Sequence, residues 1–421
     1  MKEIKPVTNI NSTIRIPGSK SISHRSAIAA GLAMGESKLT GFLACEDTLY
    51  TISVLKELGV EISTERETLE VKGMGGRFTP MQGRREFYLG NSGTSMRLLL
   101  STVSLAKGEF LLTGNPQILK RPVEELVDAL NQLGVEAFCL EQNGCPPVLV
   151  RSRGIKGGKV TISGQKSSQY LSSLLLSGPY AEKGIEIEVT GGLVSAPYVD
   201  ITIEVMREFG VSVFRDGYRY FRVPARGRYV PRQFAIEGDV SAASYFWAAA
   251  AVAGGIITTE NIRPHTTGQG DIGFLEILQQ MGCRVEREMD RVTVYGGPLS
   301  GIDADMAAMP DQVPTLASIA LFADGKTSIR NVPHVRFKES DRLKAIALEW
   351  SKLGGQVEEL TDGLVICGGG RLHGGSVESH DDHRLAMSLA VVGLKVPGVK
   401  IRNESCVNKS LPQFWKLWDS L

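Results

Sequence analysis

The sequence has little of what marks nucleic-acid-binding, membrane or secreted disulfide-rich proteins. Its 421 residues carry a formal net charge of only +1, which argues against nucleic acid or an anionic membrane as a main partner. The longest apolar run, residues 246–257, is too short to span a bilayer, and no signal-peptide pattern is present. The six cysteines are scattered and match no zinc or redox spacing. These absences predict a cytoplasmic protein with reduced thiols.

Motifs for nucleotides and metals are missing as well. The glycine-rich stretch 368–375 lacks the Gly-x-x-x-x-Gly-Lys-Ser/Thr pattern and a following helix, so it predicts a loop. His24, His373 and His380 show no ligand spacing, and we expect no metal and no cofactor. A structural hydrogen bond is the expectation for His24. Phosphoryl transfer from ATP is a poor fit to such a chain.

What the chain does have is a repeat marked by glycine. A polar helix start, a run of small and apolar residues, a glycine and a short β-branched strand ending in Gly or Asn recur at a spacing of roughly 70 residues. The repeated glycines are Gly35, Gly108, Gly184, Gly255, Gly325 and Gly398. A second series follows a second helix, at Gly59, Gly134, Gly210, Gly282 and Gly354. We interpret both series as stops at helix C-termini.

The period and the length predict an α/β protein of two domains with three repeats each. Each repeat reads helix, strand, helix and one or two strands, and units of roughly 70 residues are too long for the common solenoids. One lobe is expected to span residues 20–234, and the other residues 1–19 together with 235–421, with the sixth repeat cut short. The segments near 12–20 and 224–238 would then form a double-stranded hinge.

Polar and cationic side chains gather at the expected helix starts. If the first helices of all repeats point the same way, their N-terminal N–H groups face one cleft and favour anions. A single Ser or Asp there is more simply a helix cap, and a single Lys or Arg a solvated charge. Seven cations converging on one cleft are harder to explain without bound phosphate or carboxylate groups. They are Lys20, Arg25, Arg121, Lys338, Arg342, Arg384 and Lys409.

Three acids lie among these cations: Asp311, Glu339 and Asp341. Neighbouring cations keep carboxylates ionised, so these acids are candidates to take or relay protons. The set favours a small anionic substrate handled by acid–base chemistry.

Eight motifs, in the right order, resemble those of the 5-enolpyruvylshikimate-3-phosphate synthases, the 3-phosphoshikimate 1-carboxyvinyltransferase family. They are PGSKSISHR, LGNSGTSMRLL, KRPVEEL, SSQYLSSLL, LVSAPYVDIT, KESDRL, DDHRLAM and CVNKS. Any one alone is weakly specific, whereas the ordered set is strongly specific and covers essentially the whole chain. The resemblance implies two inside-out α/β domains, each of three βαβαββ-type repeats, that close over substrate.

The resemblance also implies a reaction and the residues that bind its substrates. The enolpyruvyl group of phosphoenolpyruvate is transferred to the 5-hydroxyl of shikimate 3-phosphate with release of phosphate, on the pathway to chorismate and the aromatic amino acids. Shikimate 3-phosphate binding is implied for Lys20, Ser21, Arg25, Ser167, Ser168, Gln169, Ser195, Tyr198, Asp311 and Lys338. Phosphoenolpyruvate binding is implied for Lys20, Gly93, Arg121, Gln169, Arg342, Arg384 and Lys409.

The catalytic residues that the resemblance implies are Asp311, Glu339 and Lys20. Asp311 would accept a proton from substrate hydroxyls, and Glu339 would exchange the proton at C3, with Lys20 or Lys338 assisting. Addition to an enol ether and C–O cleavage need such an acid–base pair and an anion clamp. The division of the protons among these four groups stays open.

The chain departs from the best-studied branch of the family at two positions. His334 stands where that branch has Asn, which leaves one substrate contact open, and Leu98 replaces a Pro. Family members are inhibited by glyphosate, a phosphoenolpyruvate mimic. Gly93 predicts sensitivity, because Ala would place a methyl group in the inhibitor's space, and Leu98 would blunt the effect if it shifted its helix.

Three alternative functions fit the sequence less well. The sister enzyme that transfers enolpyruvyl to UDP-N-acetylglucosamine shares the fold and chemistry, but it carries a reactive Cys in a loop that here, at residues 113–121, has none. RNA 3′-phosphate cyclase would need an adduct-forming His and a basic surface. A repeat scaffold without activity would have no reason to gather cations and acids on one face. We further expect a monomer.

Overall fold

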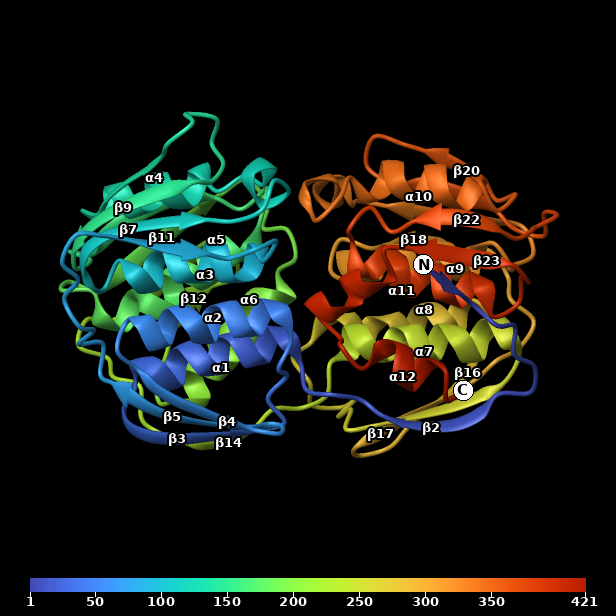
Figure 1. The fold of residues 1–421 in the computed structure, drawn as a ribbon, viewed down its shortest axis with the longest axis horizontal. Helices are drawn as coiled ribbons and strands as arrows, with labels where there is room; N and C mark the ends of the chain where they lie inside the picture. Colours follow the sequence, from blue (N-terminus) through green and yellow to red (C-terminus); the bar gives the residue numbers. More distant parts are fainter. The chain divides into compact units, whose positions relative to one another are not determined.

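The computed structural model describes residues 1–421 and divides them into two compact units (Figure 1). Unit 1 comprises Met1–Pro17 and Glu237–Leu421, and unit 2 comprises Gly18–Ile236. The chain therefore passes between the units twice, after residues 17 and 236. That these crossovers act as a hinge stays a prediction.

Unit 2 contains three four-stranded sheets of one pattern. In each sheet a first strand pairs in parallel with a second, and the remaining two strands pair antiparallel. Burial alternates along the strands, so that in β5 Leu69 and Val71 face the core while Glu70 and Lys72 face solvent. The sheets are β14 (Gln233–Ala235), β3 (Met34–Thr40), β5 (Thr68–Met74) and β4 (Glu61–Glu65); β6 (Arg84–Tyr88), β7 (Lys107–Thr113), β9 (Val148–Arg153) and β8 (Glu136–Cys139); and β10 (Gly158–Ser163), β11 (Ile185–Thr190), β13 (Tyr220–Val223) and β12 (Phe214–Asp216).

Unit 1 follows the same pattern, with one sheet incomplete. The N-terminal segment supplies β2, which pairs in parallel with β15, and β1, which completes the last sheet. The last sheet has only three strands, because the sixth repeat ends early, as the sequence predicts. The sheets are β16 (Arg284–Arg287), β17 (Arg291–Tyr295), β15 (Ile256–Glu260) and β2 (Asn11–Arg15); β18 (Asp303–Asp305), β19 (Lys326–Arg330), β21 (Leu364–Cys367) and β20 (Gln356–Glu359); and β1 (Lys2–Glu3), β23 (Val399–Arg402) and β22 (Gly375–Glu378).

The helices lie inside each unit and the sheets lie outside (Figure 1). In unit 2 they are α1 (Lys20–Leu32), α2 (Glu46–Glu57), α3 (Gly93–Val103), α4 (Glu124–Gln132), α5 (Ser168–Ser177) and α6 (Pro197–Glu208). In unit 1 they are α7 (Val240–Ala253), α8 (Phe274–Gln280), α9 (Val313–Ala320), α10 (Arg342–Ser351), α11 (His383–Gly393) and α12 (Phe414–Trp418). None of them is long and apolar enough to cross a membrane.

The composition of the first helix of each repeat explains its place inside. In α1 every residue from Ile22 to Leu32 is buried, and in α7 every residue from Val240 to Val252. Small and apolar side chains on all faces allow neighbours to pack all round the helix. A buried hydroxyl such as that of Ser26 finds an acceptor in its own helix, the carbonyl of Ile22 at 2.8 Å. The expected α/β fold of two inside-out groups of three repeats is confirmed.

The two glycine series have different roles. Gly59, Gly134, Gly210, Gly282 and Gly354 all have left-handed φ angles, from 83° to 112°, just after a helix ends, which confirms them as helix stops. The first series was also predicted to consist of helix stops, and for this series the prediction is wrong. Gly35 and Gly108 lie inside strands β3 and β7, and α7 is stopped by Gly254 rather than Gly255. The glycines of the first series therefore lie at or near the starts of strands. At these positions the chain needs either an unusual φ or a close approach to neighbouring backbone atoms.

Gly73 in β5 yields a test of this packing. A Cβ at Gly73 would lie 2.1 Å from the carbonyl oxygen of Ala30 and 2.3 Å from that of Ala33, at the end of α1. We expect Gly73→Ala to lower the free energy of unfolding by about 3 kcal/mol, because backbone atoms must move apart. Gly192→Ala is the control, since its Cβ would meet nothing within 4 Å. Urea unfolding with equal midpoints for the two variants would contradict the packing described.

Candidate active site

The first helix of each repeat in unit 2 is capped by a serine. Ser19, Ser92 and Ser167 accept backbone N–H groups of α1, α3 and α5 at 3.5, 3.2 and 3.3 Å. The ordinary explanation of these hydroxyls as caps is therefore correct. His24, buried in α1, has the expected hydrogen bond, with Nδ1 2.8 Å from Thr51 Oγ1.

Two cations of α1 have different environments. The Nζ of Lys20 lies 3.0 Å from the buried carboxylate of Asp47, on α2. Arg25 is 1% exposed and has no carboxylate among its partners. Burial lowers the pKa of Arg25 to about 10, so it is charged at neutral pH. A buried cation held only by neutral oxygens favours a nearby anion.

Two of the predicted shikimate 3-phosphate residues, Ser21 and Tyr198, contact Arg25. Its guanidinium donates to the carbonyl of Ser21 at 2.9 Å and to the carbonyl of Tyr198 at 3.2 Å. Tyr198 follows Ser195, which is 5% exposed and has a left-handed φ of 54°. Ser168, the first residue of α5, is also buried. Arg25 thus ties the start of α6 to α1.

Gln169 is bonded on both sides of its amide. Its Oε1 accepts from Arg97 Nη1 at 2.9 Å, and its Nε2 donates to Thr94 Oγ1 at 3.0 Å. The second arm of Arg97 reaches the carbonyl of Pro122 at 3.2 Å, next to Arg121. Arg97 was missed in the sequence, although it lies in the LGNSGTSMRLL motif, because a cation inside a helix resembles an ordinary surface charge.

Gly93 and Arg121 lie against each other. Arg121 is 6% exposed and donates through Nη1 to the carbonyl of Asn91 at 3.3 Å. A Cβ at Gly93 would lie 2.5 Å from the guanidinium carbon of Arg121, so any larger residue must displace that cation. Leu98, the departure noted above, is buried within α3.

In unit 1 the predicted residues meet at Arg342, which is 1% exposed. Its Nη1 donates to Asp311 at 2.8 Å and its Nη2 to Glu339 at 2.8 Å. Its Nε donates to Asp382 at 2.8 Å. Three carboxylates raise the pKa of Arg342, although burial alone would lower it. One guanidinium thus joins Asp311 of the η4 turn (Pro310–Gln312), the loop before α10 and the start of α11.

Asp311 is surrounded by cations on both oxygens. Beside the bond from Arg342, its Oδ2 accepts from Arg384 Nη2 at 2.7 Å, and Lys338 Nζ lies 3.4 Å from Oδ1. Burial alone would raise the pKa of Asp311, but Arg384, Lys338 and Arg342 hold it well below the ordinary value. Asp311 is therefore ionised, as expected for an acid among cations.

The choice of the third acid was wrong. Asp341 accepts from the backbone N–H of Lys344 as the cap of α10 and pairs with Arg336 at 3.0 Å. The third carboxylate on Arg342 belongs instead to Asp382, which is fully buried and caps α11. Lys409, 5% exposed, lies 3.7 Å from Glu339 Oε1.

A second correction concerns charge balance. The sequence predicts a cluster of seven cations that is unfavourable without bound anions. In unit 1 acidic side chains of the protein itself neutralise part of the positive charge, because Arg342 and Arg384 both bond to Asp311. Arg384 also donates to the hydroxyl of Tyr245 at 3.3 Å, a contact that no motif predicts.

His334 is buried beside this cluster, at the start of the η5 turn (Pro333–Phe337). Burial and the positive charge of Lys338 lower its pKa to about 4. His334 is therefore neutral at physiological pH, like the Asn that it replaces.

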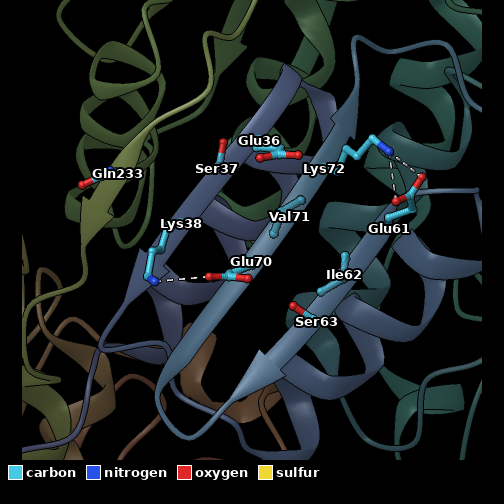
Figure 2. Close-up of a pocket in the computed structure, with 10 residues that line it drawn as sticks. All are labelled: Glu36, Ser37, Lys38, Glu61, Ile62, Ser63, Glu70, Val71, Lys72 and Gln233. Atoms are coloured by element: carbon cyan, nitrogen blue, oxygen red, sulfur yellow. Dashed lines mark hydrogen bonds and ion pairs between the residues drawn. The ribbon is translucent and has the colours of Figure 1, made fainter.

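A hollow of about 580 Å³ lies elsewhere, on the solvent face of the sheet formed by β14, β3, β5 and β4 (Figure 2). Its charges pair across strands, Lys38 with Glu70 at 3.2 Å and Lys72 with Glu61 at 3.0 Å. None of the predicted site residues lines it. Oppositely charged side chains that pair across strands in this way stabilise the sheet, and they do not indicate a ligand-binding site.

Comparison with known proteins gives one consistent result. A family model described as EPSP synthase (3-phosphoshikimate 1-carboxyvinyltransferase) matches residues 4–418. A 3-phosphoshikimate 1-carboxyvinyltransferase of Vibrio vulnificus is 41% identical over 99% of this chain and 98% of its own, and one of Shewanella loihica is 39% identical over the whole of both. A solved structure of EPSP synthase from Acinetobacter baumannii has a TM-score of 0.82 at 30% identity, covering 99% of this chain and 97% of its own.

The environment of His334 predicts a pH effect on stability. Because its pKa falls from 6.5 to about 4 on folding, the unfolded chain binds a proton first as the pH drops. The stability held by neutral His334 is complete above pH 6.5 and is lost progressively down to about pH 4. Over this pH range we expect the free energy of unfolding of His334→Asn to fall by up to about 3 kcal/mol less than that of the wild type. Urea unfolding at a series of pH values measures this free energy for both proteins. Parallel curves of unfolding free energy against pH would contradict the prediction.

Proposed function

This chain belongs to the EPSP synthase family, the 3-phosphoshikimate 1-carboxyvinyltransferases, and on that premise we propose that it transfers the enolpyruvyl group of phosphoenolpyruvate to the 5-hydroxyl of shikimate 3-phosphate. Inorganic phosphate is the second product, and the reaction lies on the pathway to chorismate and the aromatic amino acids. One observation beyond family membership supports this most: the buried cluster in which Arg342 holds Asp311, Glu339 and Asp382.

The reaction moves protons and exchanges one C–O bond for another. The 5-hydroxyl oxygen adds to C2 of phosphoenolpyruvate and gives up its proton, while C3 gains a proton and becomes a methyl group. The tetrahedral intermediate then loses phosphate from C2, and C3 returns a proton as the double bond forms again. The protein must therefore hold two phosphate groups and two carboxylates and supply an acid–base pair.

Shikimate 3-phosphate is assigned to the hydroxyls and cations of unit 2 around Arg25. Arg25 supports the assignment because it is a buried cation without a carboxylate partner. The helix N-termini of α1 and α5 add N–H dipoles that favour a phosphate. The assigned residues are Lys20, Ser21, Arg25, Ser167, Ser168, Gln169, Ser195 and Tyr198, with Asp311 and Lys338 of unit 1.

Phosphoenolpyruvate is assigned to Lys20, Gly93, Arg121, Gln169, Arg342, Arg384 and Lys409. Gly93 supports the assignment, since without a Cβ the backbone and the Arg121 guanidinium can approach one anion together. The same feature supports glyphosate sensitivity, which stays a prediction. Arg384 and Lys409 bring charge from two further elements of unit 1, α11 and the η6 turn (Glu404–Lys409).

Asp311 needs a changed environment to act as a base. Bonded to Arg342 and Arg384, it has a pKa too low for it to hold a proton well. An anionic substrate that attracts these two guanidinium groups weakens their hold on Asp311 and raises its pKa. Binding of phosphoenolpyruvate thereby makes Asp311 a stronger acceptor for the proton of the 5-hydroxyl.

Glu339 is assigned to proton exchange at C3, with Lys20 or Lys338 assisting. Its carboxylate is 8% exposed and lies between Arg342, at 2.8 Å, and Lys409, at 3.7 Å. Both cations are also assigned to phosphoenolpyruvate, which supports a place for Glu339 beside that substrate. Lys20 is the third catalytic residue proposed, supported by its bond to Asp47 at 3.0 Å, which holds the ammonium group near the start of α1.

The sister reaction on UDP-N-acetylglucosamine is the remaining candidate, and the family match disfavours it, as does the absence of Cys from residues 113–121. A monomeric state and a cytoplasmic location stay predictions.

The acceptor specificity is tested by phosphate release. The purified protein is incubated with phosphoenolpyruvate and either shikimate 3-phosphate or UDP-N-acetylglucosamine. We expect release with shikimate 3-phosphate alone, and release at least about 100-fold slower from Asp311→Asn, which keeps the shape and loses the base. Release only with the sugar nucleotide would overturn the assignment, and near-normal turnover by Asp311→Asn would refute the role of that carboxylate.

A further inference from the structure

The second parallel strand of each sheet is followed by a different residue type in the two units. In unit 2 the residues after β3, β7 and β11 are Gly41, Gly114 and Gly191. In unit 1 the residues after β15, β19 and β23 are Asn261, Asn331 and Asn403. The three asparagines have left-handed φ angles of 68°, 63° and 52°. Asn tolerates this conformation better than most residues, but Gly tolerates it best, so backbone geometry alone does not account for Asn.

The asparagine side chains share one kind of contact. Asn261 Nδ2 donates to the carbonyl of Ile16 at 2.9 Å, just after the partner strand β2. Asn331 Nδ2 donates to the Asp305 carboxylate at 2.7 Å, at the end of the partner strand β18. Asn403 Nδ2 donates to Asp381 Oδ1 at 2.9 Å, in the turn after the partner strand β22. A carbonyl or carboxylate oxygen can only accept, so the amide nitrogen is the donor in all three contacts.

The Asn403 contact joins two segments that carry anion-binding cations. Asp381 directly precedes Asp382, the cap of α11, whose second residue is Arg384. Asn403 directly precedes the η6 turn, which ends at Lys409. A second bond, from Ser379 Oγ to the Asn403 carbonyl at 3.3 Å, runs between the same segments. This hydrogen bond therefore links the segments that lead to Arg384 and Lys409.

The turn held by Asn403 is strained. His380 and Asp381 both have left-handed φ angles, 52° and 57°, which is costly for residues other than glycine. From the other side the turn is held by Glu349 of α10, whose buried carboxylate accepts from His380 Nε2 at 2.7 Å and from the backbone N–H of Glu378 at 2.9 Å. Strain persists only where neighbouring contacts impose it, and two elements impose it here.

We propose that Asn403 is a positioning residue for phosphoenolpyruvate: by holding Asp381 it sets the spacing of Arg384 and Lys409. The proposal rests on the function proposed above. Arg384 and Lys409 are both assigned to that substrate, whereas of the residues assigned to shikimate 3-phosphate alone only Asp311 bonds to Arg384. Loss of the Asn403 amide should therefore weaken the binding of one substrate selectively.

Asn403→Gly tests the link without adding backbone strain, because glycine accepts the left-handed φ at this position. We expect the KM for phosphoenolpyruvate to rise about fivefold, with kcat and the KM for shikimate 3-phosphate within about twofold of wild type. Asn403→Asp should raise the KM for phosphoenolpyruvate further, since a second carboxylate would then face that of Asp381. Asn9→Gly is the matched control, an exposed asparagine with a φ of 60°, and should leave both KM values unchanged.

Hydrogen exchange supplies a readout that does not need turnover. Backbone amides of residues 379–384 and 404–410 should exchange faster in Asn403→Gly than in the wild type, and equally fast in Asn9→Gly. An unchanged KM for phosphoenolpyruvate with unchanged exchange would overturn the proposal, as would equal changes in both KM values accompanied by a lower melting temperature. If the wild type shows no turnover with shikimate 3-phosphate, the proposed function fails. In that case, unchanged hydrogen exchange in Asn403→Gly would separately refute the link between Asn403 and Asp381.

Discussion

The arrangement of unit 1 depends on a single buried guanidinium, that of Arg342. Its bonds to Asp311, Glu339 and Asp382 connect the turn before α9, the loop before α10 and the first turn of α11. Burying so many charges is costly, and the network is stable only because each charge has a partner. Removal of Arg342 takes away the arginine partner of the fully buried Asp382, and breaking a buried ion pair typically costs about 3–5 kcal/mol. The carboxylates proposed as acid–base groups, Asp311 and Glu339, are thereby held in place by Arg342.

The cations that we assign to the substrates have different partners in the two units. Arg25 in unit 2 bonds only to hydroxyl and carbonyl oxygens, so its charge remains available to a phosphate. In unit 1 the cations already bond to carboxylates, and an anion must compete with Asp311 for Arg342 and Arg384. Such competition couples substrate binding to the basicity of Asp311, because the same guanidinium groups lower its pKa. In the proposed mechanism phosphoenolpyruvate would thereby activate Asp311, which is a weak base in the free protein.

Repetition made most of the fold predictable, because a pattern that recurs six times averages out local ambiguity. The site was predictable where motifs carry it, as for Lys20 and Arg342. Two errors show the limit. Asp341 and Asp382 are both aspartates at helix starts, and only the packing of α10 against α11 decides which of them reaches Arg342. Arg97 lies inside a helix, where sequence alone does not reveal the direction of a side chain. Long-range orientation is the part that local patterns do not contain.

The central claim is that the forked geometry of Arg342, and not its charge alone, organises the reaction. Arg342→Lys keeps the charge but cannot bond to three carboxylates in fixed directions. The direct measurement is kcat/KM for phosphoenolpyruvate in this variant, with Arg330→Lys as control, since that arginine forms an exposed pair with Asp303. We predict a loss of at least about 100-fold for Arg342→Lys with an unchanged circular dichroism spectrum, and no loss for the control. A kcat/KM within about threefold of wild type in Arg342→Lys would contradict the account.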